Sequence, residues 1–146
     1  MNKNLVLKAN KYLANVAVNH IKLHNLHWNV VGLQFKAVHE YLETIYDSMS
    51  DILDELAELI KMGGEYPLAS LKDYLEVTEI KELESKDYSI KDSLEIALKD
   101  IKLLHNNALE LRNLAQEEDY YSLQIMAENH LENYNKTIWF MESMLK

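Results

Sequence analysis

Residues 35–62 read FKAVHEYLETIYDSMSDILDELAELIKM, and this stretch decides the fold. Its apolar side chains recur every three or four positions, the spacing that places them on one face of an α-helix. They are Val38, Leu42, Ile45, Met49, Ile52, Leu56 and Leu59. Gly63-Gly64 follows directly, and glycine commonly ends helices. The stretch therefore predicts a long amphipathic helix over residues 35–62.

Three further stretches show the same helical period, and no strand pattern competes with them. They predict helices over residues 5–31 and 89–117, and a last helix from the break at Glu118-Asp119 to the C-terminus. On a helical wheel, the first helix carries a polar stripe of Lys11, Asn15, Asn19, Lys22, Asn25 and Asn29. Opposite the stripe lie Leu13, Val16, Ala17, Ile21 and Val31.

The connections between these helices are short, long and short in turn. The long one begins at Tyr66-Pro67, and we expect a short helix over residues 68–75 within it. This order is typical of a four-helix bundle with one crossover. A coiled-coil rod is the alternative, but the helical patterns break at Gly32, Gly63-Gly64 and Asp119. We therefore predict an all-α fold, a four-helix bundle with a short helix in the crossover between helices two and three, formed by a single domain of residues 1–146.

Composition limits the classes of function. The chain has 146 residues, only three Gly, one Pro and no Cys, so disulfides and thiolate metal sites are excluded. No signal-like stretch or membrane-spanning apolar run is visible, and we expect a cytoplasmic protein. The net charge is −9 without a basic patch, which disfavours nucleic acid and suits solubility or the attraction of cations.

Histidines and carboxylates recur at helical spacing in the first two helices. His20, His24 and His27 share one face of the first helix, among its apolar positions. A single histidine there is most often a hydrogen-bonded core residue, but imidazole is also a common metal ligand. In the second helix, His39 and Glu43 are four residues apart, as are Asp54 and Glu58. These four lie at the margin of the apolar face, whereas a solvated role is expected for Glu40, Asp47 and Asp51.

Helix geometry separates these residues into two half-sites. His39 and Asp54 are fifteen residues apart, about 22 Å along a helix, so one chain cannot bring both to one ion. An antiparallel hairpin that turns near Leu33 would bring His27 beside His39. A two-fold axis crossing the second helix near Ser48-Met49 would then pair each half-site with the complementary half of a second copy. Unrelated surface charges are the alternative, and spacing alone does not exclude them.

At these residues the sequence resembles the Dps family, the mini-ferritins of bacteria. The stretch HNLHWNVVG at residues 24–32 is similar to the family's signature in the first helix. The second signature is matched by Phe35, Val38-His39-Glu40, Asp54-Glu55-Leu56-Ala57-Glu58, Gly63 and Pro67. Two linked motifs at the family's separation make the likeness specific, and the order of helices and loops agrees throughout.

The resemblance implies a ferroxidase centre between two-fold-related subunits of a ferritin-like shell. Its catalytic and iron-ligating positions fall on His27, His39, Asp54 and Glu58, and the fifth falls on Glu43, where the family often has Asp. Trp28 matches a tryptophan beside the centre, although a core aromatic is the alternative. His24 matches a common residue that is not expected to be a ligand, and His20 is expected to lie in the core.

The expected function is therefore iron oxidation and storage in a twelve-subunit homo-oligomer, a dodecamer. Fe(II) and hydrogen peroxide or dioxygen are the expected substrates. Glu118, Asp119 and Glu128 are candidates for the route by which iron enters, and an ordinary solvated loop is the alternative for them.

No Glu-x-x-His motif occurs, which argues against a di-iron centre inside one bundle. DNA binding is doubtful, because no lysine-rich tail is present and twelve chains would carry a charge of roughly −100. A DNA-compacting protein of the same fold and a helical host-interaction scaffold with a vestigial metal site remain alternatives.

Overall fold

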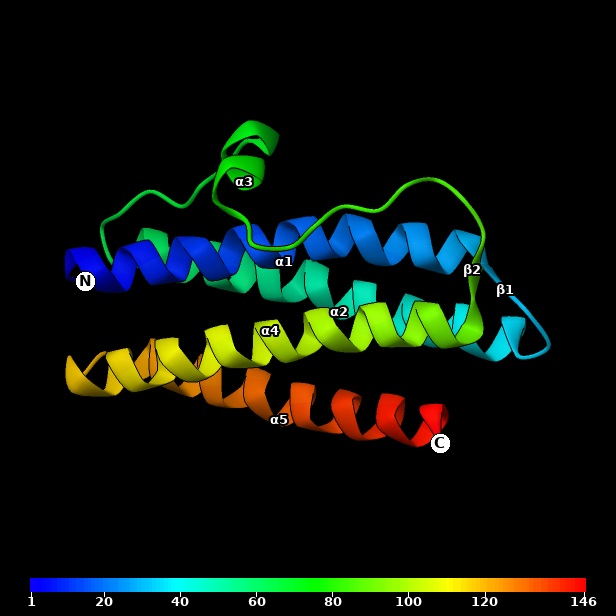
Figure 1. Ribbon diagram of the computed structural model, residues 1–146. Helices are drawn as coiled ribbons and strands as arrows, with labels where there is room; N and C mark the ends of the chain where they lie inside the picture. Colours follow the sequence, from blue (N-terminus) through cyan, green and yellow to red (C-terminus); the bar gives the residue numbers. More distant parts are fainter.

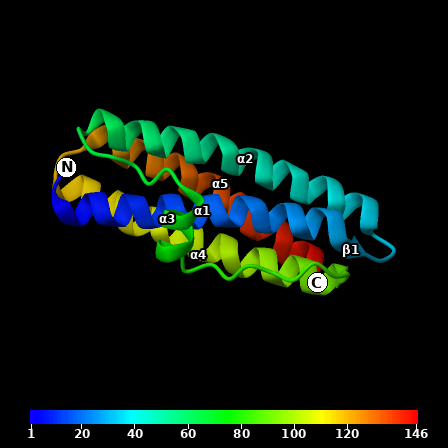
Figure 2. The ribbon, with the colours of Figure 1, turned by 90° about the horizontal axis from the view of Figure 1, so that it is seen from above.

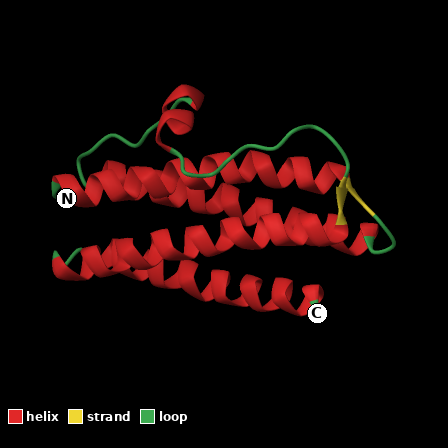
Figure 3. Ribbon diagram, viewed as in Figure 1, coloured by secondary structure: helices red, strands yellow, loops and turns green.

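The computed structural model describes all residues, 1–146, and shows four long helices and one short helix (Figures 1 and 3). The long helices are α1 (Lys3–Asn29), α2 (Phe35–Met62), α4 (Ile90–Glu117) and α5 (Tyr121–Leu145). The short helix α3 (Leu71–Val77) lies in the crossover between α2 and α4. The predicted all-α four-helix bundle with a short crossover helix is thus confirmed.

The bundle consists of two antiparallel hairpins packed against each other. One hairpin pairs α1 with α2 and the other pairs α4 with α5, and the two meet chiefly through α1 and α4. Figures 1 and 2 show the crossover running along the outside of α1, with α3 packed beside that helix. A short β-pairing also joins the two residues after α1 to the two residues before α4, so the end of the crossover next to α4 is fixed against the first hairpin. This pairing is parallel and joins β1 (Val30–Val31) with β2 (Tyr88–Ser89).

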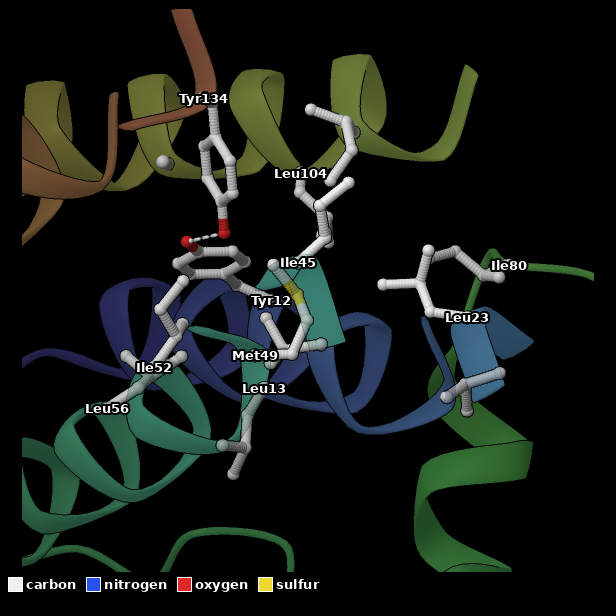
Figure 4. Close-up of a cluster of buried hydrophobic side chains, with 14 of the residues drawn as sticks. Tyr12, Leu13, Leu23, Ile45, Met49, Ile52, Leu56, Ile80, Leu104 and Tyr134 are labelled. Atoms are coloured by element: carbon white, nitrogen blue, oxygen red, sulfur yellow. Dashed lines mark hydrogen bonds between the residues drawn. The ribbon is translucent and has the colours of Figure 1, made fainter. Parts of the chain in front are cut away.

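The apolar faces of the helices meet in one core. Every position of the apolar face predicted for α2, from Val38 to Leu59, is buried. Figure 4 shows Met49, Ile52 and Leu56 of this face against Tyr12 and Leu13 of α1. Burial of such side chains is the main favourable term in folding, and truncating one to alanine typically costs about 2–5 kcal/mol.

Local signals set where the helices begin and end. The hydroxyls of Ser70 and Ser89 accept hydrogen bonds from the backbone N–H groups three residues on, and so cap α3 and α4. Between α4 and α5, Asp119 adopts a left-handed conformation with φ of 54°. Gly32 has φ of 139°, and a Cβ there would lie 2.8 Å from Cγ1 of Ile90. A side chain at that position would therefore strain the turn and displace Ile90.

Several boundaries differ from the sequence predictions. The first helix ends at Asn29, two residues early, because Val30–Val31 leave the helix to pair with Tyr88–Ser89. Two-residue strands are too short to show a period-two pattern, so this pairing was not predicted from the sequence. The crossover helix spans Leu71–Val77 rather than residues 68–75, because Ser70 supplies the N-cap.

The predicted opposition of polar and apolar faces on α1 is wrong in part. Within the polar stripe, Asn15, Asn19 and Lys22 are buried, whereas Ile21 on the apolar side is 59% exposed. The crossover and α4 cover the stripe and satisfy most of its polar groups. The amide of Asn15 bonds to Asn107 and to the crossover, and Lys22 Nζ lies 2.7 Å from Asp100 Oδ2. Burial raises the pKa of the Asp100 carboxyl, and the Lys22 ammonium opposes that rise.

Candidate metal centre

His27 and His39 lie face to face at the end of the first hairpin. Their rings are stacked, with centroids 3.7 Å apart and planes 12° apart. Nδ1 of each ring lies 2.6 Å from the backbone carbonyl oxygen of the other residue. A carbonyl only accepts, so each Nδ1 carries the proton and each Nε2 of a neutral ring keeps a free lone pair. Two nitrogen donors are therefore held in fixed orientation by the backbone itself.

The hairpin geometry explains this arrangement. His27 is in the last turn of α1 and His39 is in the second turn of α2, each about six residues from Leu33 in the loop. The antiparallel return of α2 along α1 then brings the two residues to the same level. The prediction that the hairpin places them side by side is confirmed.

Glu43 adds a carboxylate to the same end of α2. Its Oε1 lies 3.8 Å from Nε2 of His27 and accepts a hydrogen bond of 3.1 Å from the hydroxyl of Tyr46. Because Glu43 follows His39 by one helical turn, both side chains project from the same face of α2. Oxygen and imidazole nitrogen donors therefore converge at this end of the hairpin, a combination that suits iron.

Asp54 and Glu58 form a second, separate group on α2. Both carboxylates are exposed and neither has an ion-pair partner in the chain. They lie one turn apart, Asp54 about 22 Å and Glu58 about 28 Å along the helix from His39. The single chain contains no group of three or more His, Asp or Glu side chains arranged to hold a metal ion. The two half-sites predicted from the sequence thus stay apart within one chain.

Other predicted residues surround the histidine pair. His24 stacks on Tyr46 with ring centroids 3.7 Å apart, and its Nδ1 forms a hydrogen bond with the carbonyl oxygen of His20. His20 itself is half-buried, whereas it was expected to lie in the core. Trp28 is 67% exposed, so the alternative role of a core aromatic is wrong. Sequence reasoning missed Tyr46, which contacts His20, His24 and His27. Its spacing of three from Glu43 was the available signal.

The acidic residues near the start of α5 differ in their surroundings. The Arg112 guanidinium lies 3.0 Å from Oε1 of Glu128, and Gln124 donates to the same oxygen. These hydrogen bonds lower the pKa of the Glu128 carboxyl. Its negative charge is already compensated within the chain, which weakens it as a candidate for the route of iron. Glu118 and Asp119 lie in the exposed turn before α5 and remain candidates.

Acidification is expected to destabilise the folded chain as the pH falls below about 6.5. Burial lowers the pKa of His20 and of His130 from the ordinary value of 6.5. The unfolded chain therefore binds protons first, and stability that is present above pH 6.5 is lost as the pH falls toward the lowered values. The melting temperature should drop by a few degrees between about pH 7.5 and 5.5, less so in a His130→Gln variant. A melting temperature that rises on acidification would contradict this expectation.

Comparison with known proteins identifies the family. A family model described as a ferritin-like domain matches residues 7–146. The DNA protection during starvation protein of Helicobacter pylori is 36% identical over 132 residues, which cover 90% of this chain and 92% of that protein. The chain belongs to the Dps family. The resemblance seen in its two sequence motifs is thereby confirmed.

Solved structures agree with membership of the Dps family. Antigen TpF1 from Treponema pallidum superposes with a TM-score of 0.96 at 30% identity, covering 98% of this chain and 92% of its own. The Dps protein of Vibrio cholerae superposes with a TM-score of 0.93 at 26% identity, covering 99% and 90%. The latter is described as a member of a broad superfamily of ferritin-like diiron-carboxylate proteins. In the present Dps chain, no helix is long and apolar enough to cross a membrane.

Proposed function

We propose that this Dps protein is a ferroxidase that oxidises Fe(II) at sites shared between two-fold-related copies and stores the ferric product in a hollow shell of twelve subunits. The observation that carries the proposal is the stacked pair of His27 and His39, whose Nε2 atoms are left free while both Nδ1 atoms are bound to backbone. Glu43 lies beside them. In this proposal, Asp54 and Glu58 of the partner complete each site.

The spacing of these residues along α2 supports the dyad. His39 and Glu58 are equally distant from the midpoint between Ser48 and Met49, and so are Glu43 and Asp54. A two-fold axis through that point, with the two α2 helices antiparallel, places the histidine end of one helix opposite the carboxylate end of the other. Such an isologous interface necessarily makes two identical sites. Each site would have two imidazoles and three carboxylates, a donor set suited to iron.

An exposed apolar surface near the same region supports the association of two copies. Ile21 of α1 and Leu71 of α3 are 59% and 77% exposed, and Leu75 is also exposed. Together with Leu53 of α2 and Tyr74, they line a shallow hollow of about 400 Å³. We call Ile21, Leu53, Leu71, Tyr74 and Leu75 the apolar patch. Contiguous exposed apolar side chains commonly mark protein–protein interfaces, and this patch adjoins α2.

The proposed reaction uses Fe(II) and peroxide as substrates. Two Fe(II) ions each give one electron, the O–O bond of hydrogen peroxide breaks, and two hydroxide ions and two Fe(III) ions result. The carboxylates of Glu43, Asp54 and Glu58 stabilise the charge that rises during this oxidation, while the imidazoles suit both oxidation states. Because peroxide accepts two electrons at one site, formation of hydroxyl radical in one-electron steps is limited.

Sizing followed by kinetics tests the proposal. The purified protein should elute as a shell rather than as a monomer, and should bind Fe(II) under anaerobic conditions at about two sites per dimer. Addition of peroxide should then oxidise the bound iron rapidly. A protein that binds no Fe(II) tightly, or whose iron is oxidised no faster than free iron, would instead support a helical scaffold with a vestigial metal site.

DNA binding is the second candidate, because relatives carry the name of DNA protection during starvation. The net charge of −9 opposes contact with phosphate. On α1, Lys8 pairs with Glu110 and Lys11 pairs with Glu79, so both positive charges are compensated within the chain. A gel-shift assay at low salt should leave DNA unretarded, and retarded DNA would favour the architectural role.

A further inference from the structure

A chain of hydrogen bonds runs through the bundle core, apart from the candidate metal centre. The hydroxyl of Tyr12 on α1 lies 2.6 Å from that of Tyr134 on α5 and 3.0 Å from Nδ1 of His130. Nε2 of His130 lies 3.2 Å from Oε2 of Glu55 on α2. Tyr12, Tyr134 and His130 are 0, 2 and 3% exposed. Figure 4 shows the two phenols meeting through their oxygens beside Ile52 and Leu56.

The direction of each hydrogen bond follows from the chemistry of the groups. An ionised Glu55 only accepts, so Nε2 of His130 carries the proton and donates it. Burial lowers the pKa of His130, and the neutral ring then has a lone pair on Nδ1. Tyr12 must donate its single hydroxyl proton to that lone pair. Its oxygen then accepts a hydrogen bond from the hydroxyl of Tyr134. Each hydrogen bond of the network therefore has one defined donor and one defined acceptor.

This order makes Tyr12 distinctive among the nine tyrosines. Its hydroxyl alone bonds to a histidine, whereas Tyr74, Tyr88 and Tyr120 donate to backbone carbonyls. Burial raises the pKa of Tyr12 well above its usual range, so the phenol keeps its proton at rest. A phenol that loses an electron becomes strongly acidic, and a buried cation without a base is costly. His130 is a base already in hydrogen-bond contact.

The geometry points to Tyr12 as an internal one-electron reductant that protects the protein from radical oxidants. One electron passes from the phenol to the oxidant, and hydroxyl radical, for example, is reduced to hydroxide. The O–H bond of Tyr12 breaks, and its proton moves along the existing hydrogen bond to Nδ1 of His130, which lies 3.0 Å from the phenol oxygen. The products are a neutral phenoxyl radical and an imidazolium ion. The donated hydrogen bond from Tyr134 stabilises the radical oxygen, and the carboxylate of Glu55 stabilises the imidazolium.

The role complements the proposed function without depending on it. Fe(II) and peroxide that react outside a paired site yield hydroxyl radical, so a protein that handles both substrates meets this class of oxidant. A radical confined to a site that solvent does not reach cannot cross-link with the surface of another molecule. The proposal for Tyr12 nevertheless rests only on the network of Tyr12, Tyr134, His130 and Glu55. It can therefore be tested without iron.

The test uses the assembled, iron-free protein and a photochemical oxidant. A laser flash on a ruthenium polypyridyl complex, with a sacrificial electron acceptor present, generates the one-electron oxidant. The phenoxyl radical is then followed by its optical absorption and by electron paramagnetic resonance. The wild type should form a long-lived radical. The Tyr12→Phe variant should lose that long-lived signal, whereas Tyr88→Phe, which removes another buried phenol that bonds to a carbonyl, should retain it.

A second variant and a solvent change separate the redox role from a structural one. Glutamine in His130→Gln can accept the hydrogen bond but not the proton, so the radical should form about a hundredfold more slowly, the usual contribution of a positioned base. In the wild-type protein, radical formation should be slower in deuterated water than in ordinary water, because the proton leaves Tyr12 together with the electron. A long-lived radical that persists in Tyr12→Phe, or forms at the wild-type rate in His130→Gln, would overturn the proposal. Failure of iron oxidation alone would leave it standing.

Discussion

The Asp54→Ala protein is expected to assemble like the wild type but to oxidise Fe(II) with peroxide about a hundredfold more slowly. Asp54 is exposed and unpaired within its own chain, so its removal should leave the bundle intact. In the proposed shared site, however, its carboxylate completes the ligands around the histidine pair of the partner. Stopped-flow measurement of Fe(III) formation, with sizing of the same sample, checks both halves of this expectation.

Asp51→Ala is the matched control for this experiment. Asp51 lies one turn before Asp54 on α2, is likewise exposed, and is equally able to attract cations by its charge. It lies outside the two half-sites, and its removal should change the rate of iron oxidation by less than about twofold. Equal losses in Asp51→Ala and Asp54→Ala would show that the general negative charge of α2 matters rather than a specific ligand.

The Leu71→Glu protein is expected to lose the dimer interface and, with it, nearly all rapid iron oxidation. Leu71 is the most exposed member of the apolar patch, so a glutamate there should be tolerated by the isolated chain. In a two-fold interface the substitution brings two new charges into the same apolar contact, and burying unpaired charge costs several kcal/mol. Light scattering should show small species, although all five proposed ligands are unchanged.

Leu109→Glu provides the comparison for that substitution. Leu109 is an exposed leucine on α4 and lies outside the apolar patch. Its replacement introduces the same charge, so the interface between the two histidine–carboxylate half-sites should survive and oxidation should remain near the wild-type rate. If Leu71→Glu assembles and oxidises iron normally, the apolar patch is not part of the functional interface.

Much of the fold was predictable because helical period and chain breaks are local signals. The apolar face of α2 and the breaks at Gly63-Gly64 and Asp119 predicted the bundle and its crossover correctly. The juxtaposition of His27 and His39 also followed, since both are equally distant from the turn near Leu33. These predictions needed no knowledge of how distant segments pack.

The features that were predicted wrongly depend on such packing. Asn15 and Lys22 lie on a polar stripe, but the crossover and Asp100 of α4 cover them and supply their partners. No residue close to them in the sequence indicates that they would be buried. The bridge between Val30–Val31 and Tyr88–Ser89 was not predicted for the same reason, because it joins residues far apart along the chain.

Complementation between two impaired variants tests the shared site most directly. His39→Ala removes a ligand from one half-site and Asp54→Ala from the other, and each protein alone should oxidise iron about a hundredfold more slowly than the wild type. When the two chains assemble together at random, half of the dimers are mixed, and each mixed dimer has one intact site of two. Co-assembled shells should therefore recover about a quarter of the wild-type rate of iron oxidation. No recovery, in shells shown to contain both chains, would contradict a centre built from two copies of this chain.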